Sequence, residues 1–286
     1  RFDLGIYRHI SPEMVVDRVK EADIVIFAGG ISPSLEGEEM YSVNSPGFAG
    51  GDRTSIELPQ VQRDILKALK KAGKKVVFVN CSGSAVALVP EMESCDAILQ
   101  AWYPGQSGGL AVADVLFGDF NPSGKLPVTF YKNTDQLPDF EDYSMKNRTY
   151  RYMTEVPLFP FGYGLSYTTF DISKGRLNKK TISAGQDLNF KVNVKNTGKY
   201  DGAEVIQVYV RKVDDAEGPI KSLRAFRRVP LKAGETCVVS IDLLPTTFEF
   251  FDPTTNTMRI MPGKYEIMYG NSSDIPSGNK LSVTLR

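Results

Sequence analysis

Hydrophobic residues follow two different patterns along the chain, and the change between them lies near residue 165. Before that point, short apolar runs alternate with segments whose apolar residues recur every three or four positions. Such runs are typical of buried parallel strands, and the wider spacing is typical of amphipathic helices. After that point, apolar and polar residues alternate along short segments separated by turn residues. The pattern therefore predicts an α/β region followed by an all-β region.

The first region predicts buried strands with helices between them. The clearest helix start is Ser11-Pro12-Glu13, which offers a capping hydroxyl, a proline in the first turn and an acid near the helix N-terminus. The helices are expected at 11–21, 59–73, 84–88 and 108–117. The strands are expected at 23–28, 75–79 and 97–102, with an edge strand at 126–131. Strands that alternate with helices predict a mainly parallel sheet covered by helices on both faces.

The second region predicts a β-sandwich of the immunoglobulin or fibronectin type III kind. About seven short strands are expected after residue 167, and the clearest of them lie at 188–194, 205–210, 237–243, 248–251, 265–269 and 281–285. A stretch rich in proline, aspartate and aromatic residues joins the two regions. The expected division is a domain at 1–130, a connecting segment at 131–166 and a second domain at 167–286.

Composition excludes several classes of function. Lys+Arg and Asp+Glu both number 34, so the chain has no basic surplus for a nucleic-acid partner. No apolar run reaches the roughly 18 residues of a membrane-spanning helix, and no membrane partner is expected. Cys81, Cys95 and Cys237 are widely spaced and His9 is the single histidine, so neither a disulfide framework nor a metal site is expected. No organic cofactor is implied, because the Gly29-Gly30 pair lacks the rest of a dinucleotide-binding motif.

Candidate chemistry lies in the loop that follows the first expected strand. Residues 29–39 are Gly-Gly-Ile-Ser-Pro-Ser-Leu-Glu-Gly-Glu-Glu, with carboxylates at Glu36, Glu38 and Glu39. Open α/β sheets bind their ligands at the carboxyl ends of the strands. A carboxyl group there can donate or accept a proton, although cleavage of a glycosidic bond usually needs a second carboxylate across the sugar. A solvated acidic loop without chemistry is the alternative interpretation.

Longer motifs resemble one enzyme family. They occupy 51–54, 57–62, 101–109, 113–127, 150–152 and 157–167. In this order and over nearly the whole chain, they resemble the family 3 glycoside hydrolases of the β-glucosidase and β-xylosidase type. The resemblance implies the C-terminal portion of such an enzyme: an N-terminally incomplete α/β sandwich domain followed by a fibronectin type III-like domain. It also implies a partner, the N-terminal barrel domain of the same enzyme.

The resemblance implies a retaining, exo-acting β-glycosidase that hydrolyses β-xylosides or β-glucosides, with an oligosaccharide or aryl β-glycoside as substrate. The nucleophile would lie in the absent barrel, so this fragment alone is expected to be inactive. Glu38 is the preferred general acid/base if 41–50 is an insertion before Asp-Arg, and Glu36 fits the Pro-x-x-Glu arrangement of other members. A non-catalytic carbohydrate-binding or scaffold module is the alternative function.

Three further expectations complete the sequence interpretation. The chain starts at Arg1 without an initiator methionine or a signal-peptide pattern, so it is expected to be part of a longer protein. A periplasmic or secreted location is expected, with any signal peptide upstream, and an oligomeric assembly is left open. Asp52 and Arg53 are expected to pair with each other and hold the loop, with contact to sugar hydroxyls as the alternative. Trp102 is expected to pack in a corner instead of stacking on a sugar.

Overall fold

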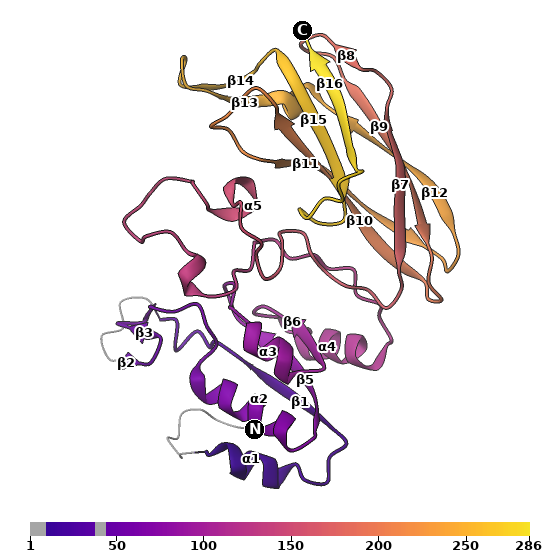
Figure 1. Ribbon diagram of the computed structural model, residues 1–286. Helices are drawn as coiled ribbons and strands as arrows, with labels where there is room; N and C mark the ends of the chain where they lie inside the picture. The colour runs from indigo at the N-terminus through magenta and orange to yellow at the C-terminus, as the bar shows by residue number, and fades with distance from the viewer. Residues whose placement is uncertain (1–9, 38–43) are drawn as a thin grey trace. The chain divides into compact units, whose positions relative to one another are not determined.

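The computed structural model describes residues 10–37 and 44–286 (Figure 1). The chain forms two compact units. Unit 1 contains the residues up to Ala113 together with Phe130–Leu137, and unit 2 contains Asp114–Thr129 together with Pro138–Arg286. The chain therefore leaves unit 1 after Ala113, returns to it for Phe130–Leu137, and then leaves it again. The domain boundaries expected at 130 and 166 stay a prediction.

Unit 1 is built on a parallel sheet with the strand order β1-β5-β6. Its strands are β1 (Ile24–Gly30), β5 (Lys75–Cys81) and β6 (Ala97–Gln100). The central strand β5 supplies the core, because Val76 and Phe78 are fully buried. On the outer strand β1, by contrast, the Ile24 and Ile26 side chains keep 55% and 51% of their surface exposed.

Helices alternate with these strands along the chain. They are α1 (Pro12–Arg18), α2 (Gln60–Lys71), α3 (Val89–Ser94) and α4 (Gly108–Phe117), the last of which continues into unit 2. The Ser11 hydroxyl caps α1 by accepting from the Met14 amide at 3.3 Å. Helix α2 contacts β5 as well as α1 and α3. The helix expected at 84–88 is not formed, because the chain turns there and α3 begins at Val89, where a proline in the first turn favours a helix start.

Short elements complete unit 1. A small antiparallel sheet contains β2 (Asn44–Ser45), β3 (Phe48–Ala49) and β4 (Asp52–Arg53). The returning segment forms one 3-10 turn, η1 (Thr134–Gln136).

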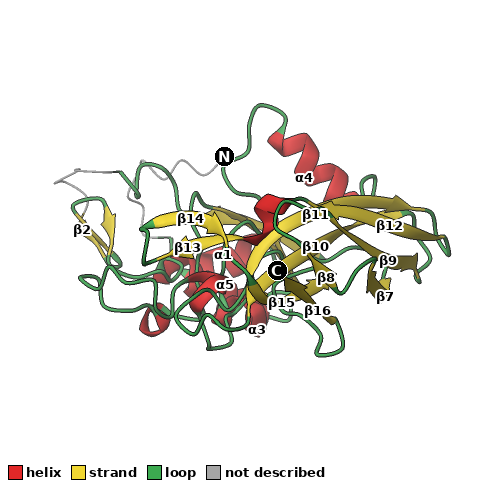
Figure 2. Ribbon diagram, turned by 90° about the horizontal axis from the view of Figure 1, so that it is seen from above, coloured by secondary structure: helices red, strands yellow, loops and turns green. Residues whose placement is uncertain are grey.

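Unit 2 is dominated by strands (Figure 2). One sheet has the order β11-β10-β15-β16-β8, a second has the order β12-β9-β7, and β13 pairs with β14. The strands are β7 (Phe170–Leu177), β8 (Thr181–Ile182), β9 (Leu188–Asn196), β10 (Gly202–Lys212), β11 (Ser222–Leu231), β12 (Thr236–Leu243), β13 (Glu249–Asp252), β14 (Thr257–Ile260), β15 (Gly263–Gly270) and β16 (Lys280–Leu285). A short helix, α5 (Thr149–Tyr152), precedes these strands in the chain, and a 3-10 turn, η2 (Pro245–Phe248), lies between β12 and β13.

The core of unit 2 follows the alternation predicted from its sequence. On β9, Leu188, Phe190, Val192 and Val194 are fully buried, while every second residue between them is at least partly exposed. These side chains join one hydrophobic cluster with residues of β10, β12, β15 and β16. Two mainly antiparallel sheets that share such a core form a β-sandwich. The fold class expected from the sequence, an α/β region followed by a fibronectin type III-like β-sandwich, is confirmed.

The edge strand expected at 126–131 is not formed. Leu126 instead pairs with the loop before β7, since its amide donates to the Tyr163 carbonyl and its carbonyl accepts from the Gly162 amide, both at 2.8 Å. These two hydrogen bonds use both backbone polar groups of Leu126, but the pairing does not continue into a strand ladder. Within 10–37 and 44–286, no helix is long and apolar enough to cross a membrane.

Candidate active site

The loop that carries Glu36 leaves β1 at a fixed point. Gly30, the last residue of β1, has a φ of +122°, and a Cβ atom there would lie 2.0 Å from the Cys81 carbonyl oxygen. Glycine is therefore required at this position. The Gln62 side chain of α2 donates to the Gly30 carbonyl at 2.7 Å and accepts from the Gly30 amide at 2.8 Å. A strand end and a helix together set the direction in which the loop starts.

Glu36 has a partner for each of its carboxylate oxygens. The Ser84 hydroxyl, beyond β5, donates to Oε1 at 2.8 Å, and the Tyr103 hydroxyl, beyond β6, lies 3.2 Å from Oε2. The Glu36 side chain keeps 26% of its surface exposed, so the carboxyl is held in place and still open to a ligand. Parallel strands end at the same edge of a sheet, which explains why three separate loops meet here.

Arg53 lies beside this carboxyl and holds Ser84. Its Nη1 donates to the Ser84 hydroxyl at 2.8 Å and to the Ala85 carbonyl at 3.1 Å, and lies 4.0 Å from Glu36 Oε1. Burial lowers the pKa of Arg53, and the negative charges of Glu36 and Glu57 offset part of that effect. The other terminal nitrogen, Nη2, is buried without a hydrogen-bond partner. The guanidinium therefore keeps one buried donor nitrogen unused.

A second carboxylate, Glu57, anchors the segment that returns to unit 1. Thr134 donates to Glu57 from its amide at 2.9 Å and from its hydroxyl at 2.6 Å, and the Ser55 hydroxyl donates as well. Burial opposes the charged form, but these hydrogen bonds together outweigh it and lower the pKa of Glu57 to about 2. A group held in its ionised form is suited to anchoring and not to giving up a proton.

Trp102 sets the course of the chain between β6 and Tyr103. Its φ of +58° lies in the left-handed region, which bulky residues rarely adopt. Its ring packs edge-on against Phe130 with the centroids 6.0 Å apart, as expected of a residue in a packed corner. The turn at Trp102 brings the Tyr103 hydroxyl to 2.8 Å from the Ile31 carbonyl, at the start of the acidic loop. Backbone strain of this kind is characteristic of sites that depend on a particular geometry.

Glu36, Arg53 and Ser84 border an open hollow in unit 1 of ≈ 550 Å³. Its lining residues are Glu36, Gly51, Asp52, Arg53, Ile56, Ser84, Ala85, Tyr131 and Leu137. The size falls within the range of small-molecule sites. The hollow thus combines a positioned carboxyl, a mostly buried cation and one aromatic ring, which can bind a polyhydroxylated ligand and exchange a proton with it.

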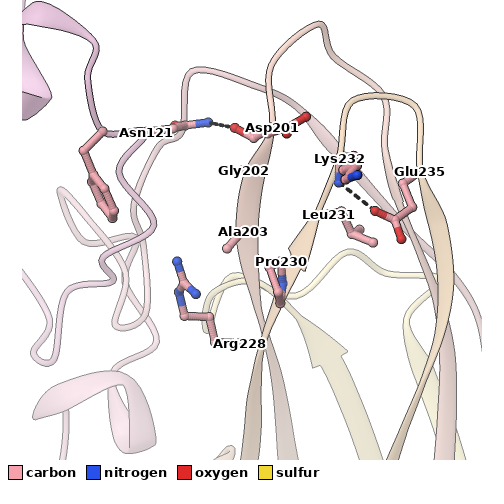
Figure 3. A pocket seen from close by; sticks show the side chains of 10 residues that line it. Asn121, Asp201, Gly202, Ala203, Arg228, Pro230, Leu231, Lys232 and Glu235 are labelled. Atoms are coloured by element: carbon pink, nitrogen blue, oxygen red, sulfur yellow. Dashed lines mark hydrogen bonds between the residues drawn. The ribbon is translucent and has the colours of Figure 1, made fainter.

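A second hollow, of ≈ 440 Å³, lies in unit 2 (Figure 3). The Asn121 side chain there donates to the Asp201 carbonyl at 2.9 Å, and the Lys232 amide donates to the Glu235 carboxylate at 2.7 Å. These bonds close the turns around β10 and β11, and the hollow holds no arrangement of groups suited to catalysis. Among the described residues, no three His, Cys, Asp or Glu side chains gather as a metal site would require.

Only some of the site residues predicted from the sequence lie in this site among the described residues. It places Glu36 in the site, whereas Glu38 and Glu39 lie outside the described residues. Arg53 turns to Ser84 and Ala85, and Asp52 is exposed, so the expected pairing of Asp52 with Arg53 is not observed.

Sequence reasoning missed the two partners of Glu36, namely Ser84 and Tyr103. A positional signal was present, because both residues closely follow an expected strand, as the acidic loop does. Their side chains are common in turns and cores, so residue type alone did not distinguish them.

Comparison with known proteins decides the family. The model of the Glycosyl hydrolase family 3 C-terminal domain matches residues 9–167, and that of the Fibronectin type III-like domain matches residues 204–273. The chain belongs to glycosyl hydrolase family 3. The two matches fall on either side of the change in hydrophobic pattern, so the family 3 resemblance found in the sequence is confirmed.

Similar proteins are named as β-xylosidases or β-glucosidases. A xylan 1,4-beta-xylosidase of Xylanibacter ruminicola is 58% identical over 100% of this chain and 33% of its own length. A periplasmic beta-glucosidase of Salmonella typhimurium is 38% identical over 92% of this chain and 35% of its own length. The chain therefore spans about a third of the length of these relatives.

Solved family 3 structures share the fold. The Bifidobacterium adolescentis GH3 β-glucosidase superimposes with a TM-score of 0.82 at 31% identity, over 99% of this chain and 42% of that one. A mutant β-glucosidase from Listeria innocua in complex with laminaribiose gives a TM-score of 0.79 at 30% identity, over 98% of this chain and 39% of that one.

Proposed function

We propose that this chain supplies the general acid/base of a retaining, exo-acting β-glycosidase, and that Glu36 is that residue. The observation that carries the proposal is the placement of Glu36 at the strand edge, with one oxygen bound to Ser84 and the other next to Tyr103, on the rim of an open hollow. Glu38, preferred from the sequence, remains the competing candidate, because it lies outside the described residues.

The reaction needs a second carboxyl group. In a retaining mechanism, two carboxyl groups about 5–5.5 Å apart act on one glycosidic bond. One attacks the anomeric carbon, while the other protonates the leaving oxygen and then deprotonates water. Glu57 does not fit the second role, because its oxygens are occupied by Thr134 and Ser55. The family resemblance implies that the nucleophile comes from a barrel domain, and the isolated chain is then expected to be inactive.

The substrate class is proposed to be β-xylosides, with β-glucosides as the alternative. Support for this order is the 58% identity to a protein named xylan 1,4-beta-xylosidase, compared with 38% to one named beta-glucosidase. The resemblance to family 3 glycoside hydrolases also implies that single sugars are removed from chain ends.

The test is a chimera in which this chain replaces the matching segment of the Xylanibacter ruminicola enzyme. The Glu36→Gln variant is expected to lose about 10²–10⁴-fold of kcat/KM on xylobiose, the usual contribution of a general acid. The exposed Glu21→Gln variant is the matched control and should retain full activity. The Glu38→Gln variant is made in parallel.

The outcomes separate the candidates. A large loss in Glu38→Gln with none in Glu36→Gln would assign the acid/base role to Glu38. No loss in either variant, or a wild-type chimera that binds xylo-oligosaccharides without hydrolysing them, would contradict the proposal and favour a non-catalytic carbohydrate-binding module.

A further inference from the structure

The two oxygens of Glu36 are not equivalent, because their partners have different hydrogen-bonding capacity. An arginine has no acceptor atom, so Arg53 Nη1 donates into the Ser84 hydroxyl oxygen. The one hydrogen of Ser84 then points to Glu36 Oε1, 2.8 Å away. The Arg53 charge, 4.0 Å from Oε1, also favours an unprotonated oxygen there. Oε1 is therefore held as an acceptor.

Oε2 faces a hydroxyl that has two acceptors within reach. The single hydrogen of Tyr103 can point to the Ile31 carbonyl oxygen at 2.8 Å or to Glu36 Oε2 at 3.2 Å, but not to both at full strength. A hydrogen bond to a charged oxygen is the stronger of the two, so the hydrogen follows Oε2 when Glu36 is ionised. Burial, and then the Glu36 charge, raise the pKa of Tyr103, so the hydroxyl keeps its hydrogen.

We propose that Ser84 and Tyr103 are positioning residues that assign the transferable proton of Glu36 to Oε2. This inference rests on the proposed role of Glu36 as the general acid/base. Ser84 fixes the carboxyl plane through Oε1. Tyr103 changes its hydrogen-bond acceptor between Ile31 and Oε2 as Glu36 loses and regains its proton.

The reaction then has a defined sequence at Glu36. In the first step the Oε2–H bond breaks and its proton passes to the leaving glycosidic oxygen, which keeps the electron pair of the cleaved C–O bond. The nucleophilic carboxylate of the family mechanism bonds to the anomeric carbon, and the Tyr103 hydrogen turns to Oε2. In the second step water bonds to the anomeric carbon and gives its proton to Oε2. The nucleophile leaves with the bonding pair, and the Tyr103 hydrogen returns to Ile31.

Leaving groups of different basicity reveal this role. The sugar released from xylobiose must be protonated as it departs, whereas 2,4-dinitrophenolate departs without a proton. Loss of a residue that stabilises the Glu36 carboxylate after proton transfer should therefore lower kcat/KM on xylobiose. It should hardly change kcat/KM on 2,4-dinitrophenyl β-xyloside. A residue with a merely structural role would affect both substrates equally.

The experiment introduces Tyr103→Phe into the chimera and measures kcat/KM on both substrates. The ring is retained, so its packing against Gly83 is preserved. We expect about a 10-fold loss on xylobiose, the effect of one charge-assisted hydrogen bond, and less than about a 2-fold loss on the dinitrophenyl substrate. The control is Tyr200→Phe, in which an exposed hydroxyl of unit 2 is removed. Equal losses on the two substrates, or no loss on either, would overturn the inference.

A second variant and a reference variant complete the design. Ser84→Ala removes the donor to Oε1 and is expected to show the same selective loss on xylobiose, so the inference can be tested even if Tyr103→Phe folds poorly. Glu36→Gln tests the underlying function. If Glu36→Gln lacks the selective loss, the proposed function fails. If Glu36→Gln shows it and the Ser84 and Tyr103 variants do not, only the positioning inference fails.

Discussion

The two units use their buried polar side chains for different purposes. In unit 2 the Gln207 amide, which is 3% exposed, donates to the carbonyls of Gly162 and Asn271 at 3.0 and 2.7 Å and so ties a loop and a strand end together. In unit 1 the side chains of Arg53 and Ser84 converge on one carboxyl beside an open hollow. Polar groups join backbone segments in one unit, and in the other they hold a carboxyl at the rim of a hollow.

The apolar residues show the same contrast. Strand β9 of unit 2 places four fully buried side chains in a shared core, whereas strand β1 of unit 1 leaves Ile24 and Ile26 more than half exposed. Buried apolar area is the main source of folding free energy. Unit 2 is therefore expected to be the more stable unit.

The largest expected effect is in the core of unit 2. Phe190 is fully buried, with its ring centroid 5.2 Å from that of Tyr269. Phe190→Ala is expected to lower the free energy of unfolding by about 3–5 kcal/mol, because it removes apolar contacts and leaves a cavity. Urea unfolding followed by circular dichroism measures this. The matched variant Ile26→Ala should lose less than about 1 kcal/mol, and an equal loss there would contradict the expected difference in stability between the units.

Next in size is the effect of Arg53 on activity. Arg53→Met keeps the apolar part of the side chain but leaves the Ser84 hydroxyl without its donor. In the chimera, kcat/KM on xylobiose is expected to fall about 10–100-fold, corresponding to the loss of a hydrogen bond from a charged donor. Arg227→Met, at an exposed position of β11, is the control. Unchanged activity in Arg53→Met would mean that the guanidinium only stabilises the fold.

The pH dependence of stability gives a third test. Folding lowers the pKa of Glu57 from its ordinary 4.5 to about 2, so this carboxylate stabilises the fold above pH 4.5 and the stabilisation is lost as the pH falls toward 2. Glu57→Gln is expected to lower the free energy of unfolding at pH 7 by about 1.5 kcal/mol, and by much less at pH 2, where about half of the native carboxyls are protonated. Chemical unfolding at several pH values measures the difference. A difference that does not vary with pH would show that the ionised form has no special role.

The smallest expected effect concerns a strained position in unit 2. Lys174 is exposed on β7 and has a φ of +56°. Lys174→Gly is expected to raise the free energy of unfolding by about 0.5 kcal/mol, because glycine relieves the left-handed strain but loses more entropy on folding. Thermal unfolding is sensitive enough to detect this change. A clear destabilisation would indicate that the lysine side chain makes a favourable contribution larger than its strain.

The sequence predicted the elements of each unit well wherever one pattern dominated. The alternation of Leu188, Phe190, Val192 and Val194 could be recognised because one face of β9 is buried and the other is not. The stretches at 84–88 and 126–131 gave wrong elements. There the conformation depends on distant partners, such as the pairing of Leu126 with Gly162 and Tyr163.

The candidate site was predictable as a place but not as a set of residues. The position of Glu36 after a strand located the edge of the sheet. The choice of Ser84 and Tyr103 as its partners depended on how three loops fold toward one another, and on a left-handed turn at Trp102 that no local preference favours. Arg53 was expected beside its sequence neighbour Asp52, but its long side chain reaches a loop thirty-one positions further along the chain.

Gly30 has a consequence for protein design. Its backbone is clamped on both polar atoms by Gln62, and the Cys81 carbonyl leaves no room for a side chain. The loop beyond it consequently begins from an anchor that does not depend on the loop's own sequence. Loops of other lengths that retain Glu36 could be grafted after Gly30 with the direction of their first residues already set, so this junction is a natural splice site that leaves the sheet unchanged.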